Sequence, residues 1–295
     1  MKQLVFVHGR AQENKDAAAL KAEWVDAWLS GLAKSGLSMP ISDTDIRFPY
    51  YGQTLYDLAQ GKTAGEAAAV IVKGDDADRE QQAFVREVIL EVQRKQGITD
   101  ADLAQAAGVD VVQRGPLNWE WLQGVLKVID QRVPLASGAS IALATNDVYQ
   151  YLDNIGIRDE IETGVRQALL PDVPTVLVAH SLGTVVAYNL LRREGAAQRW
   201  KMPLFVTIGS PLAVTAIRKK LAPNRHPTCV GRWLNVLDER DVVALYPLDA
   251  DHFPLDPQIT NKRDVDNPTP NRHGISGYLS DQEVAKALFD AVVAL

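Results

Sequence analysis

The sequence predicts an α/β protein whose central sheet is mostly parallel, with helices on both faces. Four short apolar, β-branched runs lie at 4–7, 175–179, 204–208 and 233–237, and each is followed by a turn signal. Parallel strands that are covered on both faces form continuous apolar runs of this kind. Helical patterns separate the runs, and right-handed crossovers between parallel strands place such helices on both faces of a sheet.

An amphipathic helix is predicted directly after the first strand. Its apolar residues recur every four positions and so form one buried stripe: Leu20, Trp24, Trp28 and Leu32. Gly36 stands where this helix should end, because glycine readily adopts the left-handed conformation found at helix C-termini. Residues 45–49 predict a further short strand.

The stretch 53–139 contains no convincing strand pattern. It has helical patterns at 79–95 and 118–132, so we expect a helical insertion over the sheet edge, within a single domain that spans 1–295. Part of the second pattern is an apolar helical face formed by Trp119, Trp121, Leu122 and Val125. Internal packing explains that face, and a lid over a substrate pocket is the second interpretation.

The last third of the chain completes the alternation. Residues 147–170 predict a sheet-packing helix that is broken near 154–156. Ser280 and Glu283 have the spacing of a capping box, and they precede an apolar stripe that is typical of a closing helix: Val284, Leu288 and Val292.

Composition excludes several classes of function. Lys and Arg number 31 against 37 Asp and Glu, the formal net charge is -6, and there is no long basic run, so nucleic-acid binding is not expected. The single cysteine, Cys229, forms no intramolecular disulfide and has no metal-ligand cluster around it. We expect neither a metal nor an organic cofactor. The chain enters its first strand without a secretory pattern, which predicts a cytoplasmic protein.

No charged residue occurs between positions 173 and 191, a length close to that of a membrane span. Polar and small residues interrupt the apolar character of this stretch: His180, Ser181, Gly183, Thr184 and Asn189. We therefore interpret it as a buried strand that turns into a buried helix, and we expect no transmembrane segment.

The turn between that strand and that helix carries the strongest local motif, Ala179-His180-Ser181-Leu182-Gly183. A serine on a sharp strand-to-helix turn needs small residues two positions to either side, and Ala179 and Gly183 meet that requirement. The helix that begins at Leu182 directs its N-terminal amides toward negative charge that develops near the serine. Ser181 is the candidate nucleophile.

These residues make the chain resemble the α/β-hydrolase superfamily, particularly its lipase-like and esterase-like branches. The resemblance covers most of the chain outside the insertion and rests on His8-Gly9, the Ser181 turn, Gly209-Ser210-Pro211, residues 235–242 and His273. Ala179 replaces the first glycine of G-x-S-x-G, as in some small bacterial lipases. The resemblance implies a serine hydrolase with the chain order nucleophile, acid, histidine.

Two residues are candidates for the acid. Asp238 and Asp241 both follow the strand at 233–237. The setting Asp241-Val242-Val243 is more similar to that of the acid in lipase-like members, so Asp241 is preferred. Asp238 is then the alternative acid, or else a loop cap and partner of Arg240.

Of the five histidines, His273 is the preferred base, because it follows the acid and lies in a glycine-flanked loop before the last helix. His252 also follows the acid and is the alternative. His226 precedes the acid, which is the wrong order for this fold. His180 adjoins the nucleophile on a sharp turn, where successive side chains diverge, and the resemblance gives His8 a structural role beside the oxyanion loop.

Acyl transfer also needs backbone donors for the oxyanion. One should be the amide of Leu182. By resemblance, the second is the amide of Arg10, with Gly9 giving that loop its freedom and Gly183 allowing close packing of the helix.

We therefore predict a serine hydrolase that cleaves a small-molecule or lipid carboxylic ester through an acyl-enzyme. The same residues serve amidases, peptidases and thioesterases, so these activities stay open. A non-catalytic member of the fold that binds a ligand or a partner is the alternative from another class. A membrane-surface phospholipase is a third, and it needs an exposed apolar lid. The sequence makes no prediction of the oligomeric state.

Overall fold

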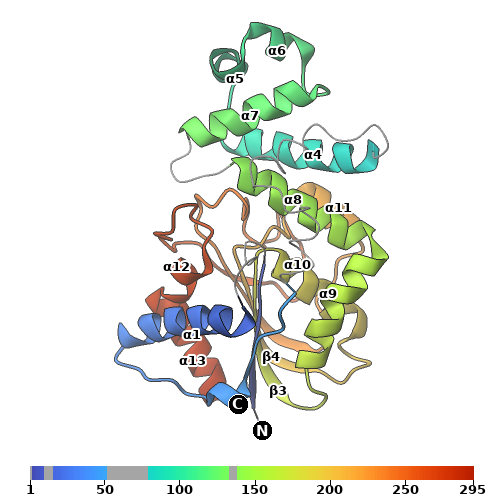
Figure 1. Cartoon of the computed structure of the whole chain (residues 1–295). Helices are drawn as coiled ribbons and strands as arrows, with labels where there is room; N and C mark the ends of the chain where they lie inside the picture. Colours follow the sequence, from blue (N-terminus) through green and yellow to red (C-terminus); the bar gives the residue numbers. More distant parts are fainter. Residues whose placement is uncertain (1, 10–15, 52–78, 133–137) are drawn as a thin grey trace.

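The computed structural model describes residues 2–9, 16–51, 79–132 and 138–295, and it has the predicted α/β fold (Figure 1). Six strands form one sheet in the order β2-β1-β3-β4-β5-β6, and every neighbouring pair is parallel. The strands are β1 (Gln3–Val7), β2 (Ile46–Arg47), β3 (Pro174–His180), β4 (Lys201–Ile208), β5 (Val230–Val236) and β6 (Thr260–Lys262).

Helices cover both faces of the sheet. In Figure 1, α1, α12 and α13 lie on one face, α9 and α10 lie on the other, and α4 to α8 gather beyond the carboxyl ends of the strands. The described helices are α1 (Ala17–Ala33), α4 (Arg79–Lys95), α5 (Asp100–Ala107), α6 (Val109–Arg114), α7 (Trp119–Arg132), α8 (Gly138–Asp153), α9 (Ile155–Ala168), α10 (Leu182–Glu194), α11 (Thr215–Lys220), α12 (Ile275–Leu279) and α13 (Gln282–Val293), with a 3-10 turn at Asp43–Asp45.

The alternation of side chains along β1 explains why the protein has two apolar clusters. Leu4 and Phe6 pack with the residues of α1 and α13, whereas Val5 and Val7 belong to the cluster that contains α4 and α7 to α10. Successive side chains of a strand point to opposite faces, so a strand with helices on both sides must be apolar throughout. This is the physical basis of the continuous apolar runs in the sequence.

Helix α1 confirms the predicted stripe, since Leu20, Trp24, Trp28 and Leu32 are all fully buried. The Asp16 carboxylate caps its N-terminus by accepting a hydrogen bond from the Ala19 amide at 2.7 Å. At the other end, Gly36 has φ +65°, which is the left-handed conformation expected there.

The predicted capping box of the closing helix is wrong. Ser280 terminates α12, and the side chain that caps α13 belongs to Asp281, which accepts from the amides of Glu283 and Val284 at 3.0 Å each. A short helix, α12, precedes α13 and takes Ser280 for its own C-terminus. The stripe of Val284, Leu288 and Val292 is buried as predicted.

The region between β2 and β3 is described in part. Helices α4 and α7 confirm the helical patterns at 79–95 and 118–132, and Asn154 caps α9 at the predicted break. Trp121, Leu122 and Val125 are buried, but Trp119 is 37% exposed. Residues 53–78 of the predicted insertion lie outside the described residues, so an insertion over 53–139 stays a prediction.

Within the described ranges, no helix is both long and apolar enough to cross a membrane. The charge-free stretch between positions 173 and 191 forms β3 and the greater part of α10, and both elements are buried against the sheet.

Candidate active site

Ser181 occupies a strained turn between β3 and α10. Its backbone has φ 54° and ψ -128°, a combination that non-glycine residues rarely adopt and that is kept only where the surroundings enforce it. Its amide donates to the carbonyl of Ile208 at 3.0 Å. The turn is tightly enclosed, since a Cβ at Gly183 would lie 2.4 Å from the Val7 carbonyl oxygen and one at Gly9 would lie 2.6 Å from the Ser181 Cβ. Only glycine fits at these two positions.

His273 links Ser181 to Asp241 through hydrogen bonds. Its Nε2 lies 2.8 Å from the Ser181 Oγ, and its Nδ1 lies 2.7 Å from the Asp241 Oδ2. An ionised carboxylate only accepts, so Nδ1 carries the hydrogen and Nε2 accepts the hydrogen of the serine hydroxyl. The structure thus brings together the three residues preferred as nucleophile, base and acid. In the sequence, Ser181 lies 92 residues before His273, and Asp241 lies 32 residues before it.

The Asp241 carboxylate is completely buried and has four donors around it. Oδ1 accepts from the amides of Val243 at 2.9 Å and Ala244 at 3.4 Å, while Oδ2 accepts from His273 and from the Tyr278 hydroxyl, each at 2.7 Å. Hydrogen bonds to the charged form compensate for the loss of water around a buried carboxylate. They also fix the plane of the carboxylate.

Asp238 does not contact His273. Its carboxylate accepts from the amides of Arg240 at 2.8 Å and Asn267 at 3.0 Å, and it pairs with the guanidinium groups of Arg240 and Arg272. Burial opposes ionisation, but these donors outweigh it and lower the pKa of Asp238. Asp238 therefore has the loop role that the sequence left open for it.

Arg272 connects the Asp238 loop to His273. It has φ +52° and immediately precedes His273, and its guanidinium lies 3.2 Å from Asp238 and 3.0 Å from Asp266. The ion pairs hold the strained residue next to the histidine. Gly209 lies beneath the histidine, where a Cβ would be 3.1 Å from the His273 Cε1.

His180 and His8 are buried beside Ser181 and His273, and both make hydrogen bonds to the backbone. The His180 Nε2 lies 2.7 Å from the carbonyl oxygen of His273, so it donates there, and burial lowers the pKa of His180 well below its usual value. The His8 Nε2 accepts from the Tyr51 amide at 3.1 Å, which leaves Nδ1–H to donate to the Gly9 carbonyl at 2.7 Å. Burial lowers the pKa of His8 to about 4. Both rings are neutral at pH 7.

The remaining histidines lie outside this group. His252 contacts Asp249 at 2.8 Å and stacks on Tyr246, with ring centroids 4.5 Å apart. His226 packs edge-on against Trp233. Ser210 is a structural serine, because its hydroxyl contacts the Thr184 hydroxyl at 2.8 Å.

Leu182 is the first residue of α10, so its amide has no carbonyl partner within the helix, as its predicted role as an oxyanion donor requires. The helix is 13 residues long, and its positive N-terminus lies beside Ser181. Arg10, the second predicted amide donor, lies outside the described residues.

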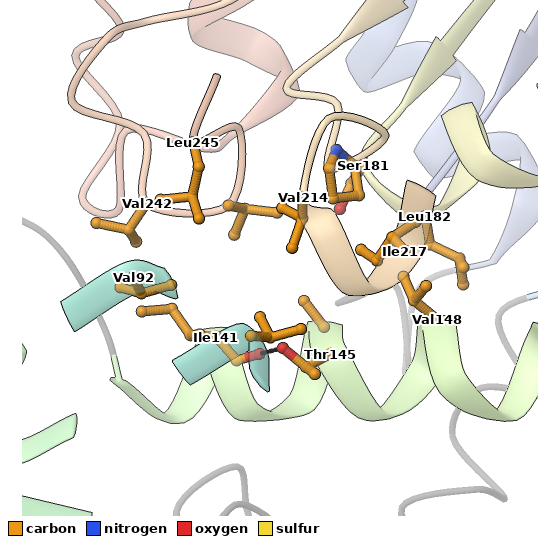
Figure 2. Close-up of a pocket in the computed structure, with 14 residues that line it drawn as sticks. Val92, Ile141, Thr145, Val148, Ser181, Leu182, Val214, Ile217, Val242 and Leu245 are labelled. Atoms are coloured by element: carbon orange, nitrogen blue, oxygen red, sulfur yellow. Dashed lines mark hydrogen bonds between the residues drawn. The ribbon is translucent and has the colours of Figure 1, made fainter. Parts of the chain in front are cut away.

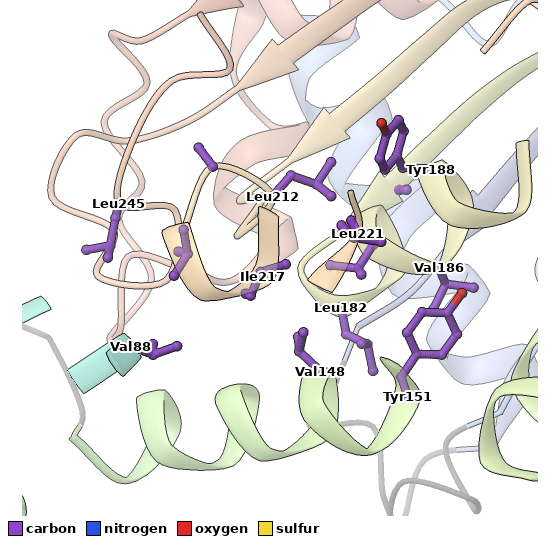
Figure 3. Close-up of a cluster of buried hydrophobic side chains, with 14 of the residues drawn as sticks. Val88, Val148, Tyr151, Leu182, Val186, Tyr188, Leu212, Ile217, Leu221 and Leu245 are labelled. Atoms are coloured by element: carbon purple, nitrogen blue, oxygen red, sulfur yellow. The ribbon is translucent and has the colours of Figure 1, made fainter. Parts of the chain in front are cut away.

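An apolar pocket opens onto Ser181 (Figure 2). Ile141, Thr145 and Val148 of α8 face Val214, Ile217 and Leu245 across it, and Val92 of α4 lies toward one end. Among the described residues that line it, only Ser181 and Thr145 are polar, and the Thr145 hydroxyl donates to the Ile141 carbonyl at 2.7 Å. Ser181 thus places a hydroxyl on a described wall that is otherwise almost entirely apolar. The wall continues into the core around α10 (Figure 3).

Glu91 is a residue of this region that the sequence did not indicate. It lies on α4, is 5% exposed, and accepts from the Thr215 amide at 3.0 Å and the Thr215 hydroxyl at 2.9 Å. Val88 and Val92 of α4 line the same pocket as Val214 and Ile217. The Glu91 contact therefore holds α4 against α11 along the pocket.

In the part of the chain that the structure describes, no group of three or more His, Cys, Asp or Glu side chains is arranged to hold a metal ion. Comparison of the chain with family models, with curated proteins and with solved structures gave no match.

Proposed function

We propose that the protein is a serine hydrolase of the α/β-hydrolase type that cleaves carboxylic esters. The observation that supports this proposal most directly is the continuous hydrogen-bonded chain from Ser181 through His273 to Asp241, at the mouth of an apolar pocket. A serine hydroxyl is a weak nucleophile until a neighbouring base takes its proton and a carboxylate orients that base.

The proposed reaction has two steps. As the Ser181 Oγ attacks the ester carbonyl carbon, its proton passes to the His273 Nε2, and Asp241 stabilises the imidazolium through Nδ1–H. His273 then gives the proton to the leaving alkoxide, which leaves the acyl group on Ser181. A water molecule repeats the sequence on the acyl-enzyme and regenerates the serine.

The negative charge on the tetrahedral oxygen is to be stabilised by the Leu182 amide and the N-terminus of α10. One backbone donor of this kind typically contributes a factor of about 10² to 10³ to the rate.

The pocket favours an ester whose acyl part is apolar. Its described walls are mostly aliphatic side chains, and none of the described residues that line it is charged. An acyl chain gains free energy there in proportion to the apolar area it buries, whereas a charged or strongly polar group would lose its hydration without a partner. Apolar carboxylic esters are therefore the proposed substrates, ahead of amides, peptides and thioesters.

A fluorophosphonate probe tests the mechanism. We expect it to label the wild-type protein at Ser181, as located by mass spectrometry of the digested protein, and not to label Ser181→Ala. Ser210→Ala is the matched control, because it removes a buried hydroxyl from the neighbouring loop and leaves Ser181 intact. A folded wild-type protein that stays unlabelled while a reference esterase reacts would falsify the proposal.

A panel of p-nitrophenyl esters with acyl chains of graded length tests the substrate class, with matched anilides and thioesters alongside. Ester hydrolysis that disappears in Ser181→Ala supports the proposal. Equal background rates in both proteins favour a binding module instead. Faster cleavage of the anilides or of the thioesters would identify amides or thioesters, respectively, as the substrate class.

A further inference from the structure

The hydroxyl of Tyr278 lies between the two acidic residues that follow β5. It is 3.1 Å from the backbone nitrogen of Asp238 and 2.7 Å from the Asp241 Oδ2. A backbone N–H only donates, so the phenol oxygen accepts there, and the phenol hydrogen is left for the carboxylate. The direction of the hydrogen bond from Tyr278 to Asp241 follows from these two contacts.

Tyr278 and His273 share one oxygen of Asp241. Oδ2 accepts from both residues, while Oδ1 is taken by the amides of Val243 and Ala244. Tyr278 is itself fully buried in α12, which begins two residues after His273. The same short segment therefore carries the base and a second donor to the acid that orients it.

We propose that Tyr278 is a positioning residue, whose hydroxyl fixes the Asp241 oxygen that faces His273 and keeps the negative charge on it while His273 is protonated. This inference rests on the proposed hydrolase mechanism. Without Tyr278, Oδ2 keeps His273 as its only described donor, while Oδ1 keeps the amides of Val243 and Ala244.

The surroundings keep Tyr278 a donor. Burial raises the pKa of Tyr278 well above its usual value, and the charge of Asp241 acts in the same direction. Among the described residues, the ionisable groups near the phenol are the carboxylates of Asp238 and Asp241, the imidazole of His273, which shares Oδ2 with it, and the imidazole of His180, whose ring centroid lies 6.4 Å away. The His180 ring is neutral at pH 7, so the two carboxylates dominate the field at the phenol.

Tyr278→Phe removes the hydroxyl and keeps the ring. We expect kcat to fall about tenfold, the loss that goes with one hydrogen bond to a charged group, and KM to stay within about twofold. One fewer donor leaves Oδ2 more basic, so a proton is retained on His273 to higher pH. The acid limb of the kcat/KM profile should therefore move to higher pH.

Tyr151→Phe is the matched control. The Tyr151 hydroxyl also donates to a buried carboxylate, Glu162, at 2.7 Å, and its ring is fully buried, but it lies away from Asp241. A purely structural role for either phenol lowers the melting temperature and leaves the acid limb in place. We expect that behaviour from Tyr151→Phe alone.

NMR gives a readout that does not depend on turnover. The titration midpoint of the His273 Cε1–H resonance should move to higher pH in Tyr278→Phe and stay in place in Tyr151→Phe. An unmoved or lowered midpoint in Tyr278→Phe overturns the inference, whether or not the wild-type protein hydrolyses esters. A raised midpoint supports the positioning role, and fluorophosphonate labelling decides separately on the proposed function.

Discussion

Gly9 and Ser181 lie so close together that a Cβ at position 9 would be 2.6 Å from the Cβ of the serine and 3.2 Å from its Oγ. The two residues come from the ends of β1 and β3, which are neighbours in the sheet. Real Cβ atoms do not approach this closely, so any other residue at position 9 must displace the serine.

Gly9→Ala should therefore cut ester hydrolysis by about 10², because a shift of about 1 Å in a reacting group has an effect of this size. Gly164→Ala is the control, since a Cβ there would meet its nearest neighbour at an ordinary 3.8 Å. Rates of p-nitrophenyl ester hydrolysis and melting temperatures of both variants check this. Full activity in Gly9→Ala contradicts the tight packing around Ser181.

The two acidic residues should separate in a mutant pair. Asp241→Asn places an amide against the His273 Nδ1 and favours the wrong tautomer, so we expect turnover to fall about 10⁴-fold. Asp238→Asn breaks ion pairs with Arg240 and Arg272, so it should lower the melting temperature and reduce turnover less than about tenfold. Steady-state kinetics with thermal unfolding decide between them, and the opposite ranking would transfer the acid role to Asp238.

His8 makes stability depend on pH. Its pKa is lowered to about 4 by burial, whereas an unfolded histidine titrates near 6.5, so below pH 6.5 the unfolded chain binds a proton that the folded protein refuses. The free energy of unfolding should drop by up to about 1.4 kcal/mol for each pH unit between 6.5 and 4 from this residue alone.

Urea unfolding at pH 7, 6 and 5 measures that drop, and the buried His180 should add to it. The His8 ring resonance of the folded protein should titrate near pH 4. A midpoint near 6.5 in the folded state is incompatible with the neutral, buried ring.

If the pocket binds the acyl chain as proposed, Val92→Trp should shorten the chains that it accepts, because the larger side chain fills one end of it. We expect kcat/KM for an octanoate ester to fall more than about tenfold while that for an acetate ester stays within about threefold. Ile155→Trp, at a position that is 64% exposed on α9, is the control. An equal loss at every chain length would indicate a general folding defect rather than a change of pocket.

Glu91→Ala should destabilise the protein and loosen α4. Two Thr215 donors lose their partner, which costs about 1–3 kcal/mol when such groups are buried. Glu87→Ala on the same helix removes only a surface pair with Lys219 and should cost less than about 1 kcal/mol. Chemical denaturation of both variants tests the difference, and similar values would mean that Glu91 does not fasten the helix.

The parts of the fold that sequence could predict are those set by local pattern. The run that forms β3, the small residues around Ser181 and the helix after it are contiguous, so the motif and its context are visible together. Strand β6 is not predicted, because Thr260–Lys262 is short and polar and nothing in its own sequence marks it as a strand. Its only described partner in the sheet is β5. The capping box predicted at Ser280 is wrong, because Ser280 is the C-cap of the intervening helix α12.

Contacts between residues far apart in the sequence are the part of the site that could not be predicted. Tyr278 meets Asp241 across 37 residues of chain and Glu91 meets Thr215 across 124, and neither pair has a motif. Their meeting depends on the order of strands and on the turn conformations between them. The residues after Asp241 favour it over Asp238 by resemblance, but only the Arg240 and Arg272 contacts show what Asp238 does instead.

The proposed activity depends on a complete sheet, because the three residues that carry it follow different strands. Ser181 follows β3, Asp241 follows β5, and His273 comes after β6 in the chain, so the hydrogen-bonded group joins segments from three separate parts of the fold. No fragment that lacks one of these strands contains all three residues in place. The proposed turnover would then report complete folding: in rising denaturant it should disappear together with the global transition, and its return on dilution would time the assembly of the whole site.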